Sequence, residues 1–127
     1  MHIEIHLTRE RIEPARSASL ANDTGAVAEF SGVVRGEENS QPIRALEYEV
    51  YSPMAERVMR EILTDLAQKL PCQSATVTHR VGVIPVGEVA IHLRVTARHR
   101  AEAFALLTGF MNRLKQDVPI WKVRALV

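Results

Sequence analysis

The sequence predicts an α+β fold in which two helices pack on one face of a sheet. Several short segments alternate apolar and polar residues, as half-buried strands do, and two longer segments repeat apolar residues at helical spacing. Each helical segment leads into another alternating segment, so each helix returns the chain to the sheet. Because the 127 residues contain no repeat, low-complexity tract or linker, residues 1–127 are expected to form a single domain.

Six segments are predicted to be strands because apolar and polar residues alternate along them. Residues 8–24 are polar and irregular, with room for a short helix, and residues 36–42 form a polar, mobile loop. Gly82 and the run Pro85–Gly87 predict a bend between two strands. The predicted strands cover residues 3–7, 26–34, 43–51, 75–81, 89–96 and 120–126.

The first helix is predicted to begin at Ser52-Pro53, since Ser is favoured as an N-cap and Pro at the first helical position. Pro71 ends it, because proline cannot continue a helix. The second helix runs from about Arg98 to Lys115. The inward-facing residues are predicted to be Met54, Val58, Met59, Ile62, Leu63, Leu66 and Leu70 in the first helix, and Ala103, Phe104, Leu107, Phe110, Met111 and Leu114 in the second.

Composition excludes several classes of protein. The net charge of +1 and the aromatic content of 5% do not favour a nucleic-acid-binding surface. No apolar run approaches the ~18 residues of a transmembrane helix, and the N-terminus lacks a signal peptide pattern, so a cytoplasmic location is expected. Cys72 is the only cysteine, which fits a reducing compartment, and we expect it to be a bystander rather than a nucleophile.

The charge is unevenly distributed along the chain. Between Arg94 and Arg124, seven Lys and Arg residues stand against two acidic residues, which indicates a small anionic ligand at one end of the fold. No metal site is expected, because the five histidines lack partners at ligand spacing. The sequence also contains neither a nucleophile elbow nor a phosphate-binding glycine loop.

The junction between the last helix and the last strand carries the most functional information. Lys115 closes the helix, Pro119 forces the helix to end, and Lys122 lies on the strand that follows. Two cations from different elements, flanked by Trp121, are consistent with a compact anion pocket. Lys122 and Arg124 are predicted to share a face of the strand. The alternative, in which both lysines simply point into water, stays open.

Other cations are expected to join them. His99 and Arg100 lie at a helix N-terminus, where free N–H groups already favour an anion. Arg35 ends a strand beside the polar loop, and His79-Arg80 lies near the end of another strand. If these side chains converge with the two lysines, they could hold a phosphate or a carboxylate.

Five groups of residues, spread along the chain from Gly25 onward, carry a resemblance to a known family. They are Gly25–Val27 with Phe30–Arg35, Leu46–Tyr51 with Met54-Ala55, His79–Gly82 with Gly87-Glu88, His99-Arg100 with Ala103-Phe104, and Leu114-Lys115 with Pro119–Lys122. In this combination and order, the chain resembles the large, catalytic subunit of molybdopterin synthase.

The resemblance implies an α/β hammerhead-like fold, with a mixed or antiparallel sheet and two main helices, and a homodimer within a heterotetramer. It implies a sulfurtransferase of molybdenum cofactor biosynthesis. Each copy would bind a small ubiquitin-like sulfur carrier whose C-terminal Gly-Gly carries a thiocarboxylate. Sulfur would pass to cyclic pyranopterin monophosphate and form the molybdopterin dithiolene. No cofactor, nucleic acid or membrane is expected as a partner.

The resemblance also implies the site residues. Lys115 matches the family's key active-site lysine, and Lys122 matches its second lysine. Lys115 would act on the proton or acyl steps of thiocarboxylate attack, while Lys122 would orient the tail or the phosphate. Substrate binding would fall to Arg35, His99 and Arg100, which hold the phosphate, and to Phe30 and Met111, which shape the channel.

The C-terminal end departs from the family pattern. Val123-Arg124 follow the Trp-Lys pair where the family usually has another basic residue and then Glu, and the printed chain stops at Val127 while family members extend further. A more open pocket, completion by a neighbouring subunit, or impaired activity would follow. Two other hypotheses are a non-catalytic paralogue that binds the carrier and an unrelated anion-binding α+β module.

Overall fold

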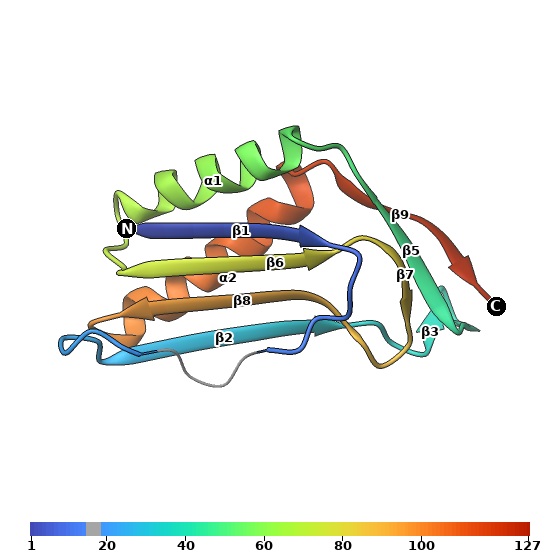
Figure 1. Cartoon of the computed structure of the whole chain (residues 1–127), viewed down its shortest axis with the longest axis horizontal. Coiled ribbons are helices and arrows are strands. Elements are labelled where there is room, and N and C mark those ends of the chain that lie inside the picture. Colours follow the sequence, from blue (N-terminus) through green and yellow to red (C-terminus); the bar gives the residue numbers. More distant parts are fainter. Residues whose placement is uncertain (15–18) are drawn as a thin grey trace.

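The computed structural model describes residues 1–14 and 19–127 and confirms the predicted α+β class. Helices and strands alternate along the chain much as the sequence predicts (Figure 1). The elements are β1 (His2–Thr8), β2 (Ala26–Val33), β3 (Glu37–Glu38), β4 (Gln41–Pro42), β5 (Ala45–Val50), α1 (Met54–Ala67), β6 (Ser74–Arg80), β7 (Gly82–Pro85), β8 (Val89–Ala97), α2 (Arg100–Asp117) and β9 (Ile120–Leu126).

The larger sheet has four strands in the order β1-β6-β8-β2. The β1–β6 pair is parallel, while the β6–β8 and β8–β2 pairs are antiparallel, so the sheet is mixed. Both helices pack on this sheet and share one core with it, in which Met59, Val77, Leu93 and Phe110 have no exposed surface. Removing this apolar surface from water is the main stabilising contribution to the fold.

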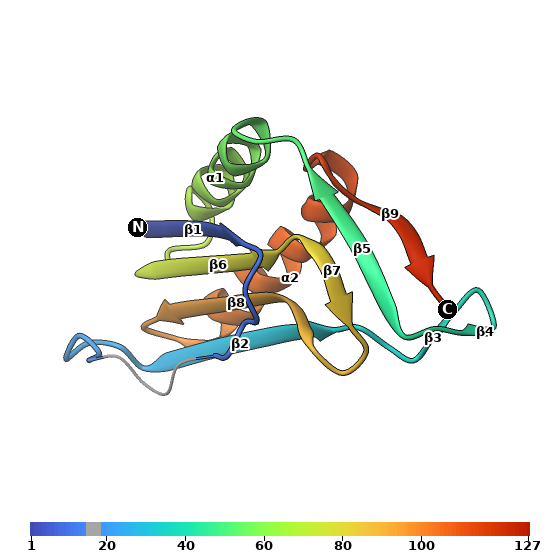
Figure 2. The same ribbon diagram turned by 45° about the vertical axis from the view of Figure 1, so that its right-hand side comes forward.

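The prediction of a single sheet is wrong. β5 pairs with β7 and β9 in a separate antiparallel sheet of order β7-β5-β9, which stands beyond one end of the larger sheet (Figure 2). Gly82 has a φ of 85°, which side-chain-bearing residues rarely adopt, and it turns the chain directly after β6. Residues predicted as a bend therefore become β7. Leu46 and Ile84 help to form a second, smaller core under this sheet.

The two segments predicted to be irregular differ in outcome. Residues 36–42 hold the two-stranded β3–β4 ribbon, which reverses direction at Asn39 and Ser40, both with positive φ. Of residues 8–24, positions 15–18 lie outside the described residues. Residues 9–14 and 19–24 contain no helix, so the possible short helix is absent from the described part of this segment.

The prediction that Ser52 caps the N-terminus of α1 is wrong. The Ser52 hydroxyl contacts the carboxylate of Glu56 at 2.7 Å instead of a backbone N–H, and the helix begins at Met54 after Pro53. Met54 itself is 37% exposed, so the buried face of α1 is narrower than the predicted stripe. It consists of Ala55, Met59, Ile62 and Leu63.

The second helix is close to its predicted span but differs in one inward residue. Phe104 was expected inside and is 61% exposed, whereas Leu106 is fully buried. α2 continues to Asp117 and ends before Pro119, as the missing N–H of proline requires. The chain then turns into β9, so the C-terminal end of α2 lies beside the second sheet (Figure 1).

Candidate functional site

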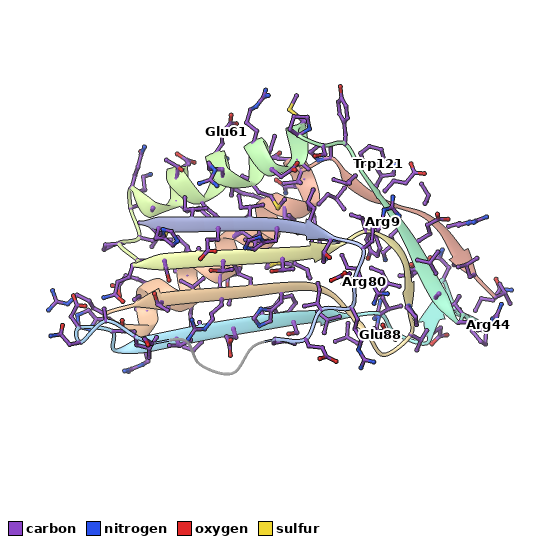
Figure 3. All side chains as sticks on the ribbon, in the orientation of Figure 1. Arg9, Arg44, Glu61, Arg80, Glu88 and Trp121 are labelled. Atoms are coloured by element: carbon purple, nitrogen blue, oxygen red, sulfur yellow. The ribbon has the colours of Figure 1, made fainter. Side chains whose placement is uncertain are left out.

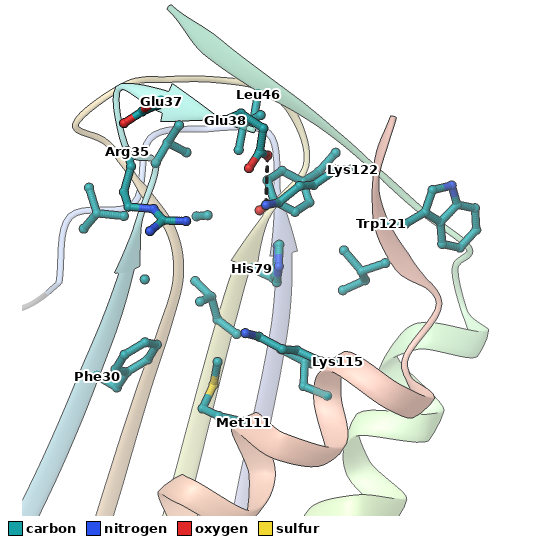
Figure 4. A pocket seen from close by; sticks show the side chains of 18 residues that line it. Phe30, Arg35, Glu37, Glu38, Leu46, His79, Met111, Lys115, Trp121 and Lys122 are labelled. Atoms are coloured by element: carbon teal, nitrogen blue, oxygen red, sulfur yellow. Dashed lines mark hydrogen bonds and ion pairs between the residues drawn. The ribbon is translucent and has the colours of Figure 1, made fainter. Parts of the chain in front are cut away.

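A cavity of about 500 Å³ lies where α2 and the ends of the large-sheet strands meet the second sheet. Its walls come from β2 and the segment after it, from β5, β6 and β8, and from α2 and β9 (Figure 4). Because these elements are distant in sequence, the fold rather than any single motif assembles the cavity. Side chains that reach it include Phe30, Arg35, Tyr48, His79, Met111, Lys115 and Lys122.

Both lysines of the predicted pair line this one cavity. Lys115 reaches it from the last turn of α2, and Lys122 reaches it from β9 (Figure 4). Arg35 adds a third cation from the segment after β2. The indole of Trp121 points away from the two lysines and is 47% exposed. The cavity therefore presents three cationic groups from three elements to a single ligand-sized volume.

Apolar side chains make up much of the remaining wall. Phe30 lies on β2 and is partly exposed, and Met111 lies one helical turn before Lys115. Leu46 and Ile91 add buried surface from β5 and β8. A flat organic group could pack on this wall while its anionic group meets the cations.

A carboxylate pairs with one of these cations, Lys122. Oε2 of Glu38, on β3, accepts a hydrogen bond from Nζ of Lys122 at 3.0 Å. The Glu38 side chain is 21% exposed, so this ion pair is partly shielded from solvent. It also ties the β3–β4 ribbon to β9 across the cavity.

Two further polar groups, Tyr48 and His79, pack against each other in the wall. Their ring centroids lie 5.4 Å apart in an edge-to-face arrangement. Burial raises the pKa of the Tyr48 hydroxyl, and the positive charge of Lys122 offsets part of that rise. Burial also lowers the pKa of His79, although its hydrogen bond to the Arg80 carbonyl acts in the opposite direction. Both side chains are therefore neutral at neutral pH.

The prediction that Lys122 and Arg124 share a face is wrong. β9 contains a bulge, because Lys122 pairs with Tyr48 while Arg124 pairs with Glu47, the adjacent residue of β5. Adjacent residues of a strand point to opposite faces, so Arg124 turns away from the cavity. Its Nε lies 2.5 Å from Oε1 of Glu47.

His99 and Arg100 do not reach this cavity within one chain. They line a separate hollow of about 470 Å³ beside Gly25, at the N-terminal end of α2. Lys115 lies near the other end of this 18-residue helix, and the helix spans about 27 Å at its usual rise. Convergence of all the predicted cations therefore does not occur inside a single chain.

Arg80 also takes no part in the cavity. Its Nη1 lies 2.6 Å from Oε1 of Glu88, and both side chains are largely buried. Figure 3 shows the two residues beside β7. Alternation along β6 places Arg80 on the face opposite His79. This pair is a structural contact between β6 and the turn before β8.

Glu38 and Tyr48 line the cavity but were not predicted as site residues from the sequence, whereas His79 was predicted only as part of the basic pair His79-Arg80. His79 has a recognisable signal, because it follows Ala75 and Val77 at alternate positions that face the core. A buried polar residue in a row of apolar residues lowers the stability of the fold unless it forms hydrogen bonds. Glu38 gives no such signal, since an acidic residue in a polar loop is ordinary.

Among residues 1–14 and 19–127, no group of three or more His, Cys, Asp or Glu side chains is placed to hold a metal ion. Within the same residues, neither helix has both the length and the apolar character needed to cross a bilayer.

The fold and the cavity agree with the comparisons to known proteins. The family model for the MoaE protein matches residues 7–117. The chain belongs to the MoaE family. The family predicted from the sequence, that of the molybdopterin synthase catalytic subunit, is confirmed by relatives carrying that name. The human protein is 40% identical over 120 residues, covering 93% of this chain and 64% of its own length. The Bacillus subtilis protein is 39% identical over 100 residues, covering 79% of this chain and 64% of its own length.

Solved structures place this chain in the same fold family. Molybdopterin synthase from Staphylococcus aureus matches with a TM-score of 0.85 and 31% identity, covering 92% of this chain and 87% of that one. A complex of subunits 1 and 2 of the molybdopterin-converting factor from Helicobacter pylori matches with a TM-score of 0.74 at 17% identity, which shows a shared fold. The chain spans slightly less than two thirds of the length of the human and Bacillus relatives.

Proposed function

We propose that this chain is the catalytic subunit of a molybdopterin synthase, which moves sulfur from a carrier thiocarboxylate to cyclic pyranopterin monophosphate. The observation that carries the proposal is the meeting of Arg35, Lys115 and Lys122 at one open cavity with an apolar wall. Such a site suits a ligand with a flat ring and an anionic group. Membership of the MoaE family supports the same reaction.

The geometry supports a division of labour within the cavity. Lys115 projects from the end of α2 toward the middle of the cavity, where it can reach both a bound ring and an incoming tail (Figure 4). It acts on the proton or acyl steps of sulfur transfer. Lys122 and Arg35 hold the anionic groups, and Phe30 and Met111 shape the channel.

The proposed partner is a small ubiquitin-like protein whose C-terminal Gly-Gly thiocarboxylate enters this cavity. Capture of an anionic C-terminus by basic groups is a known mode of peptide recognition. Because the sulfur arrives on the partner, the cavity requires no cysteine. Cys72 is not among the residues that line it.

A role for His99 and Arg100 in the same reaction requires a second copy of the chain. Within one chain they lie at the far end of α2 from Lys115. In the proposed homodimer, the second copy would bring its α2 N-terminus to the cavity and supply these two cations. The assembly with two carriers would then be a heterotetramer.

The decisive experiment is sulfur transfer with thiocarboxylated carrier and cyclic pyranopterin monophosphate. We expect Lys115→Ala to reduce product formation by at least about 100-fold, the usual contribution of a positioned acid or base. Lys69→Ala is the matched control, because Lys69 is exposed and does not line the cavity. Dimer mass and carrier binding should be unchanged in both variants.

Three results would contradict the proposal. Full turnover by Lys115→Ala would remove the role assigned to that lysine. A wild-type chain that binds the carrier but forms no product would instead support the non-catalytic paralogue. A chain that binds neither carrier nor pterin would support an unrelated anion-binding module.

A further inference from the structure

His79 occupies a position that the sheet otherwise gives to apolar residues. It lies near the carboxyl end of β6, between Leu7 of β1 and Ile91 of β8. The residues before it on the same face, Ala75 and Val77, have no exposed surface, and His79 is only 5% exposed. A buried imidazole costs stability unless its nitrogens find partners.

One nitrogen of His79 has a partner, and that partner fixes the tautomer. Nδ1 lies 2.7 Å from the carbonyl oxygen of Arg80. Because a carbonyl oxygen can only accept, Nδ1 carries the hydrogen and donates it. In the neutral imidazole, Nε2 is then left with a lone pair.

The other nitrogen has no partner among the described residues. No hydrogen bond to Nε2 of His79 is formed there, although the ring lines the cavity between the two lysines (Figure 4). The edge-to-face contact with Tyr48 holds the plane of the ring. The result is a fixed, neutral acceptor beside groups that, as cations, can only donate, namely Arg35, Lys115 and Lys122.

We propose that His79 is a further ligand-contacting residue of this cavity, and that its Nε2 accepts a hydrogen bond from an N–H or O–H group of the bound ring. This inference rests on the proposed function and deepens it. The class of ligand follows from the combination of one acceptor with several cations: it is a heterocycle that carries a hydrogen-bond donor as well as an anionic group. An aliphatic phosphate or a plain carboxylate would leave Nε2 unused.

Two substitutions separate this role from a purely structural one. Asn at position 79 can place an amide N–H near the Nδ1 position but has nothing at Nε2, whereas Gln can place its amide oxygen near Nε2. We expect His79→Asn to weaken binding of cyclic pyranopterin monophosphate by about tenfold, the order of one hydrogen bond to a buried polar group. His79→Gln should recover part of that loss.

Isothermal titration calorimetry on the intact chain provides the measurement, with sulfate as a second probe. Sulfate has no hydrogen-bond donor at neutral pH, so its affinity should differ less than about twofold between wild type and His79→Asn. Thermal unfolding of each variant reports whether the fold is intact. If the variants unfold, the wild-type chain labelled with ¹⁵N-histidine replaces them: the Nε2 resonance of His79 should move on addition of the pterin and not of sulfate.

The outcomes also distinguish this inference from the proposed function. Equal pterin affinity of wild type and His79→Asn, or a stationary Nε2 resonance, overturns the role of His79 alone. Weaker binding by His79→Gln than by His79→Asn also overturns it, because the Nδ1 contact would then be the important one. A wild-type chain that binds sulfate but not the pterin overturns the proposed function and this inference together.

Discussion

Nζ of Lys122 donates a hydrogen bond to Oε2 of Glu38 at 3.0 Å, so one of the two cavity lysines is already paired with a carboxylate. The two residues come from different sheets and lie 84 positions apart in the sequence. An anionic ligand that approaches Lys122 must compete with this carboxylate or share the lysine with it. The ion pair also links the β3–β4 ribbon to β9.

Removing the Glu38 charge should make the cavity a better anion site. We expect Glu38→Gln to raise the affinity for sulfate two- to fivefold, because a partly exposed ion pair contributes up to about 1 kcal/mol. Glu47→Gln is the matched control, since Glu47 on β5 pairs with Arg124 on the face of β9 opposite Lys122. Calorimetry at low and high salt measures both variants. Weaker sulfate binding by Glu38→Gln would show that the ion pair positions Lys122 for the ligand instead of competing for it.

A second prediction concerns the turn that leads into β2. A Cβ on Gly25 would collide with the carbonyl oxygen of Arg98, and the Gly25 N–H is bound to the Ala97 carbonyl at 3.0 Å. The backbone cannot move away without losing that hydrogen bond. Gly25→Ala should therefore lower the free energy of unfolding by about 1–3 kcal/mol.

Urea denaturation provides the measurement, and Gly36→Ala provides the control. A Cβ on Gly36 would meet only the side chain of Val86, at an ordinary contact distance of 3.7 Å. If both substitutions have the same effect, steric contact at Gly25 is not the cause.

Local sequence patterns predicted the individual helices and strands better than they predicted how the strands assemble into sheets. The alternation in residues 75–81 and 89–96, and Pro119 after the last helix, place strands and a helix end within a few residues of where the structure has them. Membership of a sheet depends on pairing between distant segments, which alternation does not encode. For this reason the second sheet, built around β5, could not be separated from the first.

In the candidate site too, local features could be predicted from the sequence, whereas the spatial arrangement of distant residues could not. Lys115 and Lys122 could be selected because a proline-limited turn joins their elements. Arg124 was misplaced because a bulge in β9 opposite Tyr48 inverts the alternation, and alternation alone does not reveal a bulge. His99 and Arg100 were assigned to the site from their place at a helix N-terminus and from the family resemblance, although the length of α2 keeps them apart from Lys115 in one chain.

A third prediction is that Cys72 is dispensable. Its Sγ faces the carbonyl oxygen of Glu102 at 3.5 Å, and burial, followed by the negative charge of Glu102, raises the pKa of the thiol. At neutral pH the thiol is therefore less ionised than a free cysteine and a poorer nucleophile. Cys72→Ser should leave sulfur transfer within about twofold of wild type, and iodoacetamide should label the native chain slowly. Loss of transfer in Cys72→Ser would place a sulfur intermediate on this chain instead of on the partner.

The last prediction concerns the pH dependence of stability. Burial lowers the folded-state pKa of His79 below the ordinary value of 6.5, so the unfolded chain binds a proton there more readily than the folded chain. The stability that depends on neutral His79 is complete above that ordinary value and is lost as the pH falls through the folded pKa. Gln at position 79 does not titrate, so His79→Gln lacks this component of the pH dependence.

The free-energy advantage of wild type over His79→Gln should therefore shrink between about pH 8 and about pH 5 in urea denaturation. The other charged and titratable groups that line the cavity are Arg35, Glu37, Glu38, Tyr48, Lys115 and Lys122. They are present in both proteins, so their contributions largely cancel. His2→Gln is the control substitution, because His2 is exposed on β1 and does not line the cavity. A gap between wild type and His79→Gln that stays constant over this range would mean that His79 titrates alike in the folded and unfolded chain, and that the imidazole is not held neutral by its burial.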